Sequence, residues 1–318
     1  MSLEAKIVFT HERIFQFASQ CKDKIYVAFS GGKDSTVLLH LVRTCFPDCP
    51  AVFVNTRNEY PEVIDFVHTI TNCTIIIPEL TYFPVCDIYG YPVISKEVSK
   101  NISRFRGTTD PLQREYRLTG CKNGVKCGSV GVIPKKYHSL IDAPFKISDM
   151  CCDILKKKPM KLYEKRTGNR PIIGTMATDS YRRAQSYRVS GCNNFTLGEE
   201  RSTPMGFWTE KDVWDYIKMF NLSYSKIYDM GENRTGCMFC LFGCHLEEEP
   251  NRIQRMYYYH PKLYWYYISK MKPILDFMMI PYHYRPTLGW DWDRIVPMDC
   301  PKNCPTRPRT RIMVGEIE

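Results

Sequence analysis

The sequence predicts an α/β fold in which a parallel, twisted sheet carries helices on both faces. Short apolar runs at 25–29, 51–55, 74–77 and 171–175 have the length and composition of buried strands. Segments with a helical pattern separate these runs, and such alternation gives a parallel sheet with right-handed crossovers. Ligands of such sheets bind at the carboxyl ends of the strands, so the residues after each strand are the first candidates for a site.

Local signals for helices support this order of elements. Residues 4–21 have the pattern of an amphipathic surface helix that leads into the first strand. Pro61 suits the first turn of a helix after the second strand, and Thr209 with Asp212 resembles a capping box. By contrast, residues 83–135 are expected to be less regular.

The length of 318 residues exceeds that of a usual single domain, so we expect a core with an appended region. Residues 1–235 are assigned to a nucleotide-binding α/β domain. Residues 236–318 form a region rich in cysteine and aromatic residues, with a mostly helical pattern over 251–280. Most of these aromatic side chains are expected to pack as core, and a minority could stack on bases.

The composition is globular, with an excess of positive charge. The formal net charge of +10 favours a polyanionic partner or substrate. No apolar run reaches the roughly 18 residues that a membrane span needs, and the N-terminus lacks the apolar core of a signal peptide. We therefore expect a cytoplasmic protein without membrane contact. In that compartment, the 15 cysteines suit metal or cluster ligation better than a disulfide framework.

A glycine-rich loop follows the first predicted strand. Free backbone N–H groups and the positive end of the next helix would point at an anion there, and two glycines allow close approach. It is not a Walker A loop, because that motif needs glycine at the position of Val27. The alternative is an ordinary turn between strand and helix. We predict that a nucleotide binds to Ser30, Gly31, Gly32, Lys33, Asp34, Ser35 and Thr36.

Two further segments follow strands on the same rim of the sheet. Asn55 could hydrogen-bond an adenine or ribose group there, or it could only cap its turn. After the fourth strand, Arg182, Arg183 and Arg188 can pair with phosphate or sulfate oxygens in fork geometry.

Basic and hydroxyl side chains are dense between residues 96 and 117. Such a segment suits contacts with the phosphates of a nucleic acid, with Phe105 or Tyr116 available for base stacking. A solvated helix face explains the same pattern. Nearby, Cys121 and Cys127 are too loosely spaced to be counted as ligands.

Two cysteine motifs supply four thiolates from distant parts of the chain. These are Cys151, Cys152, Cys237 and Cys240. Four thiolates suit either zinc or a 4Fe-4S cluster. Adjacent side chains point apart, with Cα atoms about 3.8 Å from each other, which suits two corners of a cubane better than one zinc ion. Zinc and buried thiols remain the alternatives, and Cys244 and His245 are spare ligand candidates.

The loop sequence S-G-G-K-D-S resembles the PP-loop of the ATP pyrophosphatase, or adenine nucleotide alpha-hydrolase, superfamily. The paired cysteines, followed by Lys-Lys-Lys-Pro, and the C-x2-C pair resemble the cluster motif of adenylyl-sulfate reductases and of DNA phosphorothioation sulfurtransferases. Over roughly residues 24–245 the chain is similar to the phosphoadenosine phosphosulfate (PAPS) reductase family. Its other matching motifs are Asp179-Ser180-x-x-Arg183 and Trp208-Thr209-x-x-Asp212-Val213. The resemblance implies a Rossmann-like fold.

The resemblance also implies an enzyme that binds ATP with Mg²⁺ and adenylates an acceptor with release of pyrophosphate. It would then support sulfur transfer to DNA or tRNA, with Lys33, Asp34 and Arg183 as catalytic residues. A sulfur donor such as a cysteine desulfurase would be a partner, and the chain could form a homo-oligomer.

Two alternatives stay open. One is reduction of adenylyl sulfate or PAPS, although the C-terminal Glu-Cys-Gly-x-His motif of sulfonucleotide reductases is not found. Cys300 and Cys304 lie in Asp-Cys-Pro and Asn-Cys-Pro contexts instead. The other is a nucleotide- or nucleic-acid-binding protein without catalysis.

Overall fold

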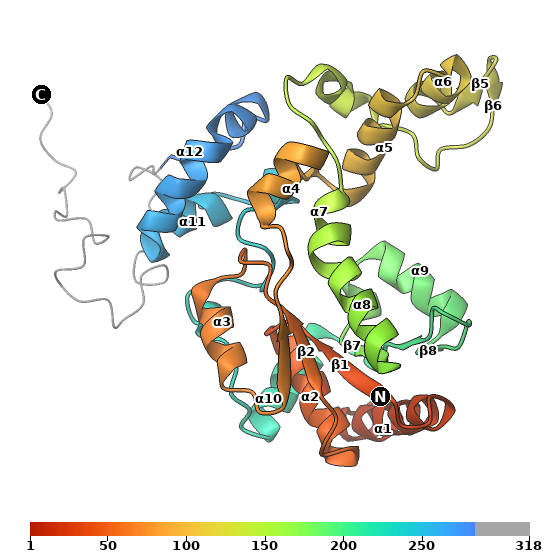
Figure 1. Ribbon diagram of the computed structural model, residues 1–318, viewed down its shortest axis with the longest axis vertical. Helices are drawn as coiled ribbons and strands as arrows, with labels where there is room; N and C mark the ends of the chain where they lie inside the picture. The colour runs from red at the N-terminus through yellow and green to blue at the C-terminus, as the bar shows by residue number, and fades with distance from the viewer. Residues whose placement is uncertain (284–318) are drawn as a thin grey trace, which may run out of the picture. The chain divides into compact units, whose positions relative to one another are not determined.

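The computed structural model describes residues 1–283, which divide into two compact units (Figure 1). The first unit comprises Met1–Tyr82, Cys152–Ile227 and Arg234–Gly236. The second unit comprises Phe83–Cys151, Tyr228–Asn233 and the described residues from Cys237 onward. The division into two domains after residue 235 stays a prediction. Cys300 and Cys304 lie outside the described residues.

The first unit contains a six-stranded sheet of order β3-β2-β1-β7-β9-β8. Its strands are β1 (Ile25–Phe29), β2 (Ala51–Val54), β3 (Cys73–Ile76), β7 (Arg170–Ile173), β8 (Asn193–Asn194) and β9 (Arg201–Ser202). Every pairing is parallel except that of β8 with β9. All four predicted strands are present, and the predicted parallel α/β fold is confirmed.

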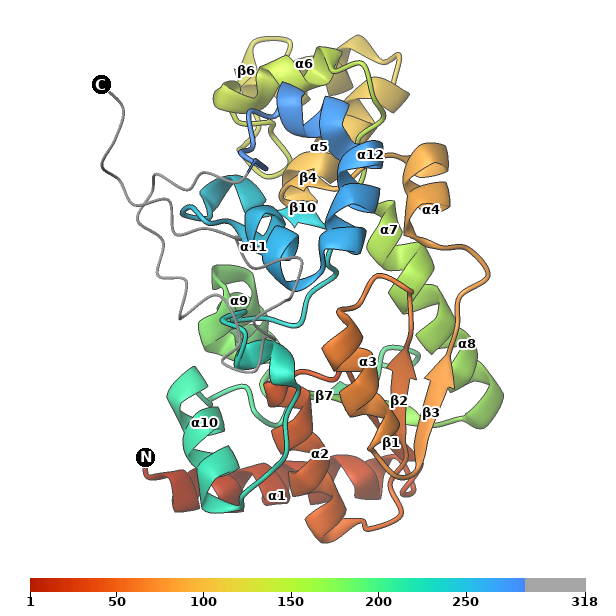
Figure 2. The ribbon, with the colours of Figure 1, turned by 90° about the vertical axis from the view of Figure 1, so that its left-hand side faces the viewer.

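Helices cover both faces of this sheet (Figures 1 and 2). The helices of the unit are α1 (Leu3–Gln20), α2 (Lys33–Cys45), α3 (Pro61–His68), α8 (Lys158–Thr167), α9 (Tyr181–Ser190) and α10 (Glu210–Met219). On one face, Tyr163 of α8 packs against Tyr26 and Val52. Side chains alternate along a strand, so Val27 faces the opposite side, where α2 packs against β1. Between α1 and the loop before α10, the buried Trp208 indole donates to Thr10 Oγ1 (2.9 Å).

The predicted helix starts of the first unit are confirmed. Pro61 occupies the first turn of α3. Thr209 caps α10, where its hydroxyl and the Asp212 carboxylate form a reciprocal capping box.

The second unit is mainly helical. Its helices are α4 (Tyr82–Tyr89), α5 (Lys96–Gly107), α6 (Pro111–Thr119), a 3₁₀ segment (Lys135–Asp142), α7 (Met150–Cys152), α11 (Arg252–Tyr259) and α12 (Pro261–Phe277). A π-helical turn, Asp153–Lys157, joins α7 to α8. Two small sheets pair β4 (Val93–Ile94) with β10 (Leu241–Phe242) and β5 (Cys121–Lys122) with β6 (Val125–Lys126).

The expectation that residues 83–135 are less regular is wrong, because α5, α6 and most of α4 lie there. The caps are visible in the sequence: Ser95 accepts the Val98 N–H at the start of α5, and Asp110 precedes Pro111 at the start of α6. The apolar pattern is weak, however, because α6 buries no residue. The predicted helical pattern over 251–280 is confirmed by α11 and α12.

Within residues 1–283, no helix combines the length and the apolarity that a membrane crossing requires.

Candidate nucleotide site

The predicted PP-loop follows β1, the strand at which the order of strand addition along the sheet reverses. From β1 the chain proceeds outward to β2 and β3, and it returns to place β7 on the other side of β1. Loops that follow strands on the two sides of such a point diverge and leave a crevice for a ligand. Here the loop after β1 is Ser30–Gly32, and the segment after β7 begins with Gly174. A Cβ atom at Gly174 would lie 3.0 Å from the carbonyl oxygen of Asp34, so the two segments are in close contact.

Hydroxyl groups inside the PP-loop hold its backbone in shape. Ser35 Oγ accepts the Ser30 N–H (3.2 Å) and donates to the Gly32 carbonyl (2.9 Å). The Thr36 hydroxyl donates to the same carbonyl (3.0 Å). Both side chains are buried, so in this structure they shape the loop rather than offer donors to a ligand. Gly32 caps α2 without a side-chain hydrogen bond, and the N–H groups at the start of a helix point out of its N-terminal end, which suits an anion.

Gly31 is required by both conformation and space. Its φ is +72°, a region that residues with a side chain rarely adopt. A Cβ atom there would lie 2.6 Å from Val63 Cγ1. The loop therefore owes its shape partly to the packing of α3 against it.

Lys33 is buried, with only 6% of its surface exposed. Its Nζ lies 3.1 Å from Glu210 Oε1 and 5.9 Å from the centre of the Trp214 ring. Both partners belong to α10, which the sequence predicts as a helix. Neither was predicted as a site residue, because 177 or more positions separate them from Lys33 and no local motif joins them.

The Asp34 carboxylate lies in surroundings that disfavour its negative charge. Burial raises its pKa above the usual value, the charge of Lys33 opposes this, and the nearby Asp179 raises it further. Among the described residues, Asp34 Oδ1 is buried without a hydrogen-bond partner and lies 3.9 Å from Lys33 Nζ. A buried, unsatisfied carboxylate oxygen beside a phosphate-binding loop fits a Mg²⁺ ligand.

Arg183 is held at this site by a carboxylate. Asp179 pairs with the Arg183 guanidinium and also accepts the Met176 N–H (3.2 Å), while Ser180 caps α9. The side chain of Arg183 is half exposed, and its charge is close enough to lower the pKa of Asp34. The predicted Lys33, Asp34 and Arg183 therefore lie at one site. Arg182 and Arg188 are exposed elsewhere along α9.

Asn55 follows β2 on the same rim and caps a turn. Its Oδ1 accepts the Arg57 N–H (2.9 Å). Next to it, the buried Glu59 carboxylate accepts from the Thr56 hydroxyl (2.8 Å) and pairs with Lys156 (3.4 Å). The role of Asn55 in nucleotide binding stays a prediction.

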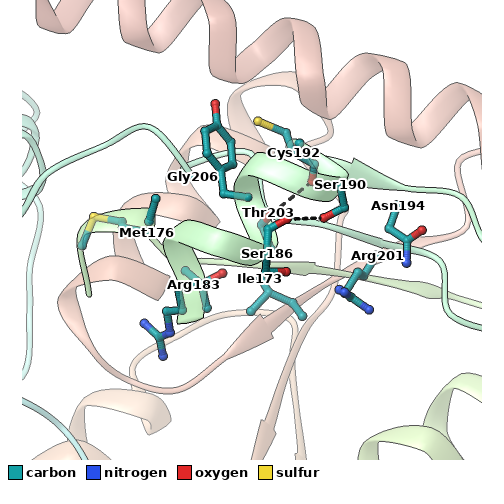
Figure 3. A pocket seen from close by; sticks show the side chains of 14 residues that line it. Ile173, Met176, Arg183, Ser186, Ser190, Cys192, Asn194, Arg201, Thr203 and Gly206 are labelled. Atoms are coloured by element: carbon teal, nitrogen blue, oxygen red, sulfur yellow. Dashed lines mark hydrogen bonds between the residues drawn. The ribbon is translucent and has the colours of Figure 1, made fainter. Parts of the chain in front are cut away.

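A cavity of about 200 Å³ adjoins the site through Arg183 (Figure 3). Arg201, Ser186 and Asn194 also line it, together with the Cys192 thiol, whose pKa is raised by burial. Two guanidinium groups and several hydroxyls suit an oxyanion.

The predicted metal ligands lie in two places. Cys151 is buried and Cys152 half-buried in α7, immediately before the π-helical turn. Cys237 and Cys240 form a tight turn before β10, in which the Cys240 N–H donates to the Cys237 carbonyl (3.2 Å).

One hydrogen bond of this turn fits thiolate ligation. The Phe242 N–H donates to Cys240 Sγ (3.5 Å), and such bonds to sulfur tune metal-bound thiolates. In the part of the chain that the structure describes, no three His, Cys, Asp or Glu side chains are placed to hold one metal ion. The spare candidate Cys244 is buried, which raises its pKa to about 12 and favours the neutral thiol. The other spare candidate, His245, lies 3.2 Å from the Tyr137 hydroxyl.

The fold and this loop define a nucleotide-binding protein of the PP-loop class. Residues 24–78 and 107–241, more than half of the chain, match the phosphoadenosine phosphosulfate reductase domain. The chain belongs to this family.

Individual relatives are more distant. An uncharacterised protein of Methanocaldococcus jannaschii is 25% identical over 267 residues, which cover 81% of this chain and 51% of the relative. An adenosine 5'-phosphosulfate reductase of Staphylococcus haemolyticus is 24% identical and covers 69% of this chain and 70% of the relative. A solved tRNA thiolase of Methanococcus maripaludis with its 4Fe-4S cluster covers 87% of this chain and 80% of its own, at 14% identity and a TM-score of 0.38. The chain thus spans about half the length of the first of these curated relatives.

Proposed function

We propose that this chain is an ATP-dependent enzyme that activates an acceptor by adenylation and supports sulfur transfer to a nucleic acid, DNA or tRNA. The observation that supports it is the grouping of Lys33, Asp34 and Arg183 around the PP-loop. A buried lysine, an unsatisfied carboxylate and a guanidinium match what phosphoryl chemistry needs: charge neutralisation, a cation ligand and an oxyanion clamp.

The proposed reaction has two steps. An acceptor oxygen attacks the α-phosphorus of ATP, so a bond from that oxygen to phosphorus forms as the bond to pyrophosphate breaks. Sulfide, or the persulfide of a donor such as a cysteine desulfurase, then attacks the activated acceptor, and the oxygen leaves with AMP. Where a persulfide attacks, a thiol reductant then cleaves the resulting disulfide and leaves the sulfur on the acceptor. Lys33 and Arg183 would neutralise charge on the phosphates, and Asp34 would hold Mg²⁺.

We further propose that a 4Fe-4S cluster binds through Cys151, Cys152, Cys237 and Cys240. The donor set fits because it consists of four thiols, and Cys240 already accepts a backbone N–H at its sulfur. When bound through all four thiolates, the cluster would order the surrounding backbone, and to hold sulfide at an iron it would need one of these thiolates to give up its place.

A second candidate function is reduction of adenylyl sulfate or PAPS. The name of the Staphylococcus haemolyticus relative favours it. A reductase of this kind needs a nucleophilic cysteine, and the Glu-Cys-Gly-x-His motif that supplies it is not found in the sequence. We therefore rank this function second.

The test is a direct comparison of the two reactions. Anaerobic protein is incubated with ATP, Mg²⁺, DNA or tRNA and a sulfur donor, and separately with adenylyl sulfate and thioredoxin. We expect pyrophosphate release that depends on the nucleic acid, and its loss in Lys33→Ala. Lys211→Ala, an exposed residue of α10, is the matched control. Sulfite from adenylyl sulfate would identify a reductase, and ATP binding without turnover a binding protein.

A further inference from the structure

In the second unit, positive charge is concentrated in one segment. Residues 96–136 contain ten lysines and arginines against three aspartates and glutamates, a net +7 of the total +10. They form α5, α6 and the β5–β6 hairpin, which lie side by side (Figure 1). This basic segment is therefore the main positively charged surface of the second unit, and it would attract a polyanion.

Two of the three acidic groups are occupied by backbone donors. Asp110 accepts the Leu112 N–H (2.9 Å) at the start of α6. Glu115 accepts the N–H groups of Asn123 (2.8 Å) and Gly124 (2.9 Å), and so clamps the turn of the hairpin. Both carboxylates therefore stabilise the segment through hydrogen bonds to its own backbone.

Two of the ten cations are also internal. Arg106 donates to the carbonyls of four residues, Leu140, Ile141, Ala143 and Phe145, and Arg117 donates to the Gly131 carbonyl (2.9 Å). The exposed cations that remain are Lys100, Arg104, Arg114, Lys122, Lys126, Lys135 and Lys136.

The aromatic side chains of the segment are covered by cations. The Arg114 guanidinium lies 5.0 Å from the centre of the Phe105 ring. Tyr116 has Arg117 and Lys122 at 5.9 and 5.8 Å from its ring centre, and its hydroxyl donates to the Val130 carbonyl (2.7 Å). The expected base stacking on Phe105 or Tyr116 would have to displace these cations. Because cations already lie near both rings and exposed cations outnumber these aromatic side chains, the segment favours a phosphate backbone over unpaired bases.

We propose that the basic segment, residues 96–136, is the docking surface for the phosphate backbone of a double-helical nucleic acid. The inference rests on the proposed function, because it assigns the place at which the acceptor binds. Exposed lysines on a protruding hairpin can reach phosphates on a helical surface without reading the sequence.

The experiment measures binding of the full chain to labelled duplexes of about 20 base pairs, DNA and RNA, and to the matching single strands, over a range of salt. The variant is Lys122→Glu with Lys126→Glu, whose side chains are on the exposed hairpin. The matched control is Lys262→Glu with Lys270→Glu, two exposed lysines of α12. Both changes alter the net charge equally.

We expect the hairpin variant to lose about tenfold or more in duplex affinity, and its salt slope to fall by about two, since about one counterion is released per lost phosphate contact. The control should stay close to wild type. Equal losses in both variants, or tighter binding of single strands than of duplexes, would overturn the proposal. Pyrophosphate release from ATP in the presence of the duplex separates the cases: if both release and duplex binding are unchanged in the hairpin variant, the docking surface is wrong and the enzyme class is not. The pair Lys122→Gln and Lys126→Gln repeats the test with a milder change.

Discussion

Removal of Lys33 and removal of Ser35, two of the polar side chains of the PP-loop, should affect different properties: the first ATP affinity and the second stability. In Lys33→Met, the aliphatic chain still packs beside Trp214, but the ammonium group is lost. Its partner Glu210 has a side chain that is 63% exposed, so loss of that ion pair should cost less than about 1 kcal/mol of unfolding free energy. One charge-assisted contact with phosphate is worth about 1.5–3 kcal/mol, so ATP affinity should fall roughly 10- to 150-fold.

In Ser35→Ala, the loss should appear first in stability. The buried hydroxyl joins the Ser30 N–H to the Gly32 carbonyl, and two hydrogen bonds of about 1 kcal/mol each are removed. Calorimetric titration with ATP and urea unfolding would separate the two effects, with Lys211→Met as the control on an exposed lysine. Unchanged ATP affinity in folded Lys33→Met would refute the phosphate role, and unchanged stability of Ser35→Ala would refute the structural one.

Three further predictions follow from the described contacts. Burial raises the pKa of Asp34, so the ionised carboxylate lowers the stability of the folded protein at pH values above the ordinary pKa of an aspartate. The Asp34→Asn variant should therefore gain stability relative to wild type as pH rises from about 4 to 7. Its binding of ATP with Mg²⁺ should weaken. A constant difference across that range would contradict this. Arg106→Gln should lower the unfolding free energy by about 2–3 kcal/mol, because four carbonyls lose a charged donor, and an unchanged urea midpoint would disprove the structural role. Anaerobically purified protein should be brown with about four irons per chain, and each alanine variant of Cys151, Cys152, Cys237 and Cys240 should lose them. Zinc instead of iron would exclude the cluster, and full iron in Cys152→Ala would point to Cys244.

The strands of the first unit could be predicted because buried parallel strands are continuous apolar runs. The run Ile25–Phe29 is β1 in the structure without a shift, and the other three predicted strands are displaced by one residue or less at their starts. The helices α5 and α6 were missed for the opposite reason. They bury few side chains, so their caps at Ser95 and Asp110 were the stronger signals.

The residue types of the candidate site could be predicted from the sequence, but the distant residues that contact them could not. The PP-loop could be predicted because the whole sequence S-G-G-K-D-S stands between a buried strand and a helix, whereas a glycine pair alone would suit an ordinary turn. The pairing of Lys33 with Glu210 depends on where α10 packs, and nothing in the local sequence near position 33 specifies that. Likewise, the close approach of Gly174 to Asp34 follows from the pairing of β7 beside β1.

Contacts within the fold also decide whether a side chain that could bind a ligand is available to do so. Ser35 and Thr36 are potential phosphate donors by type, yet both hydroxyls are used by the Gly32 carbonyl. Arg106 is a potential nucleic-acid contact by type, yet its guanidinium donates to carbonyls at the end of the 3₁₀ segment and in the loop after it. In both regions, backbone carbonyls compete with the ligand for the donors, because a buried carbonyl without a partner costs more than an exposed side chain gains. A count of suitable side chains in the sequence therefore overestimates the number of donors that each site can offer to a ligand. The side chains to mutate first are therefore Asp34, whose Oδ1 is buried without a hydrogen-bond partner within residues 1–283, and the exposed cations of the basic segment.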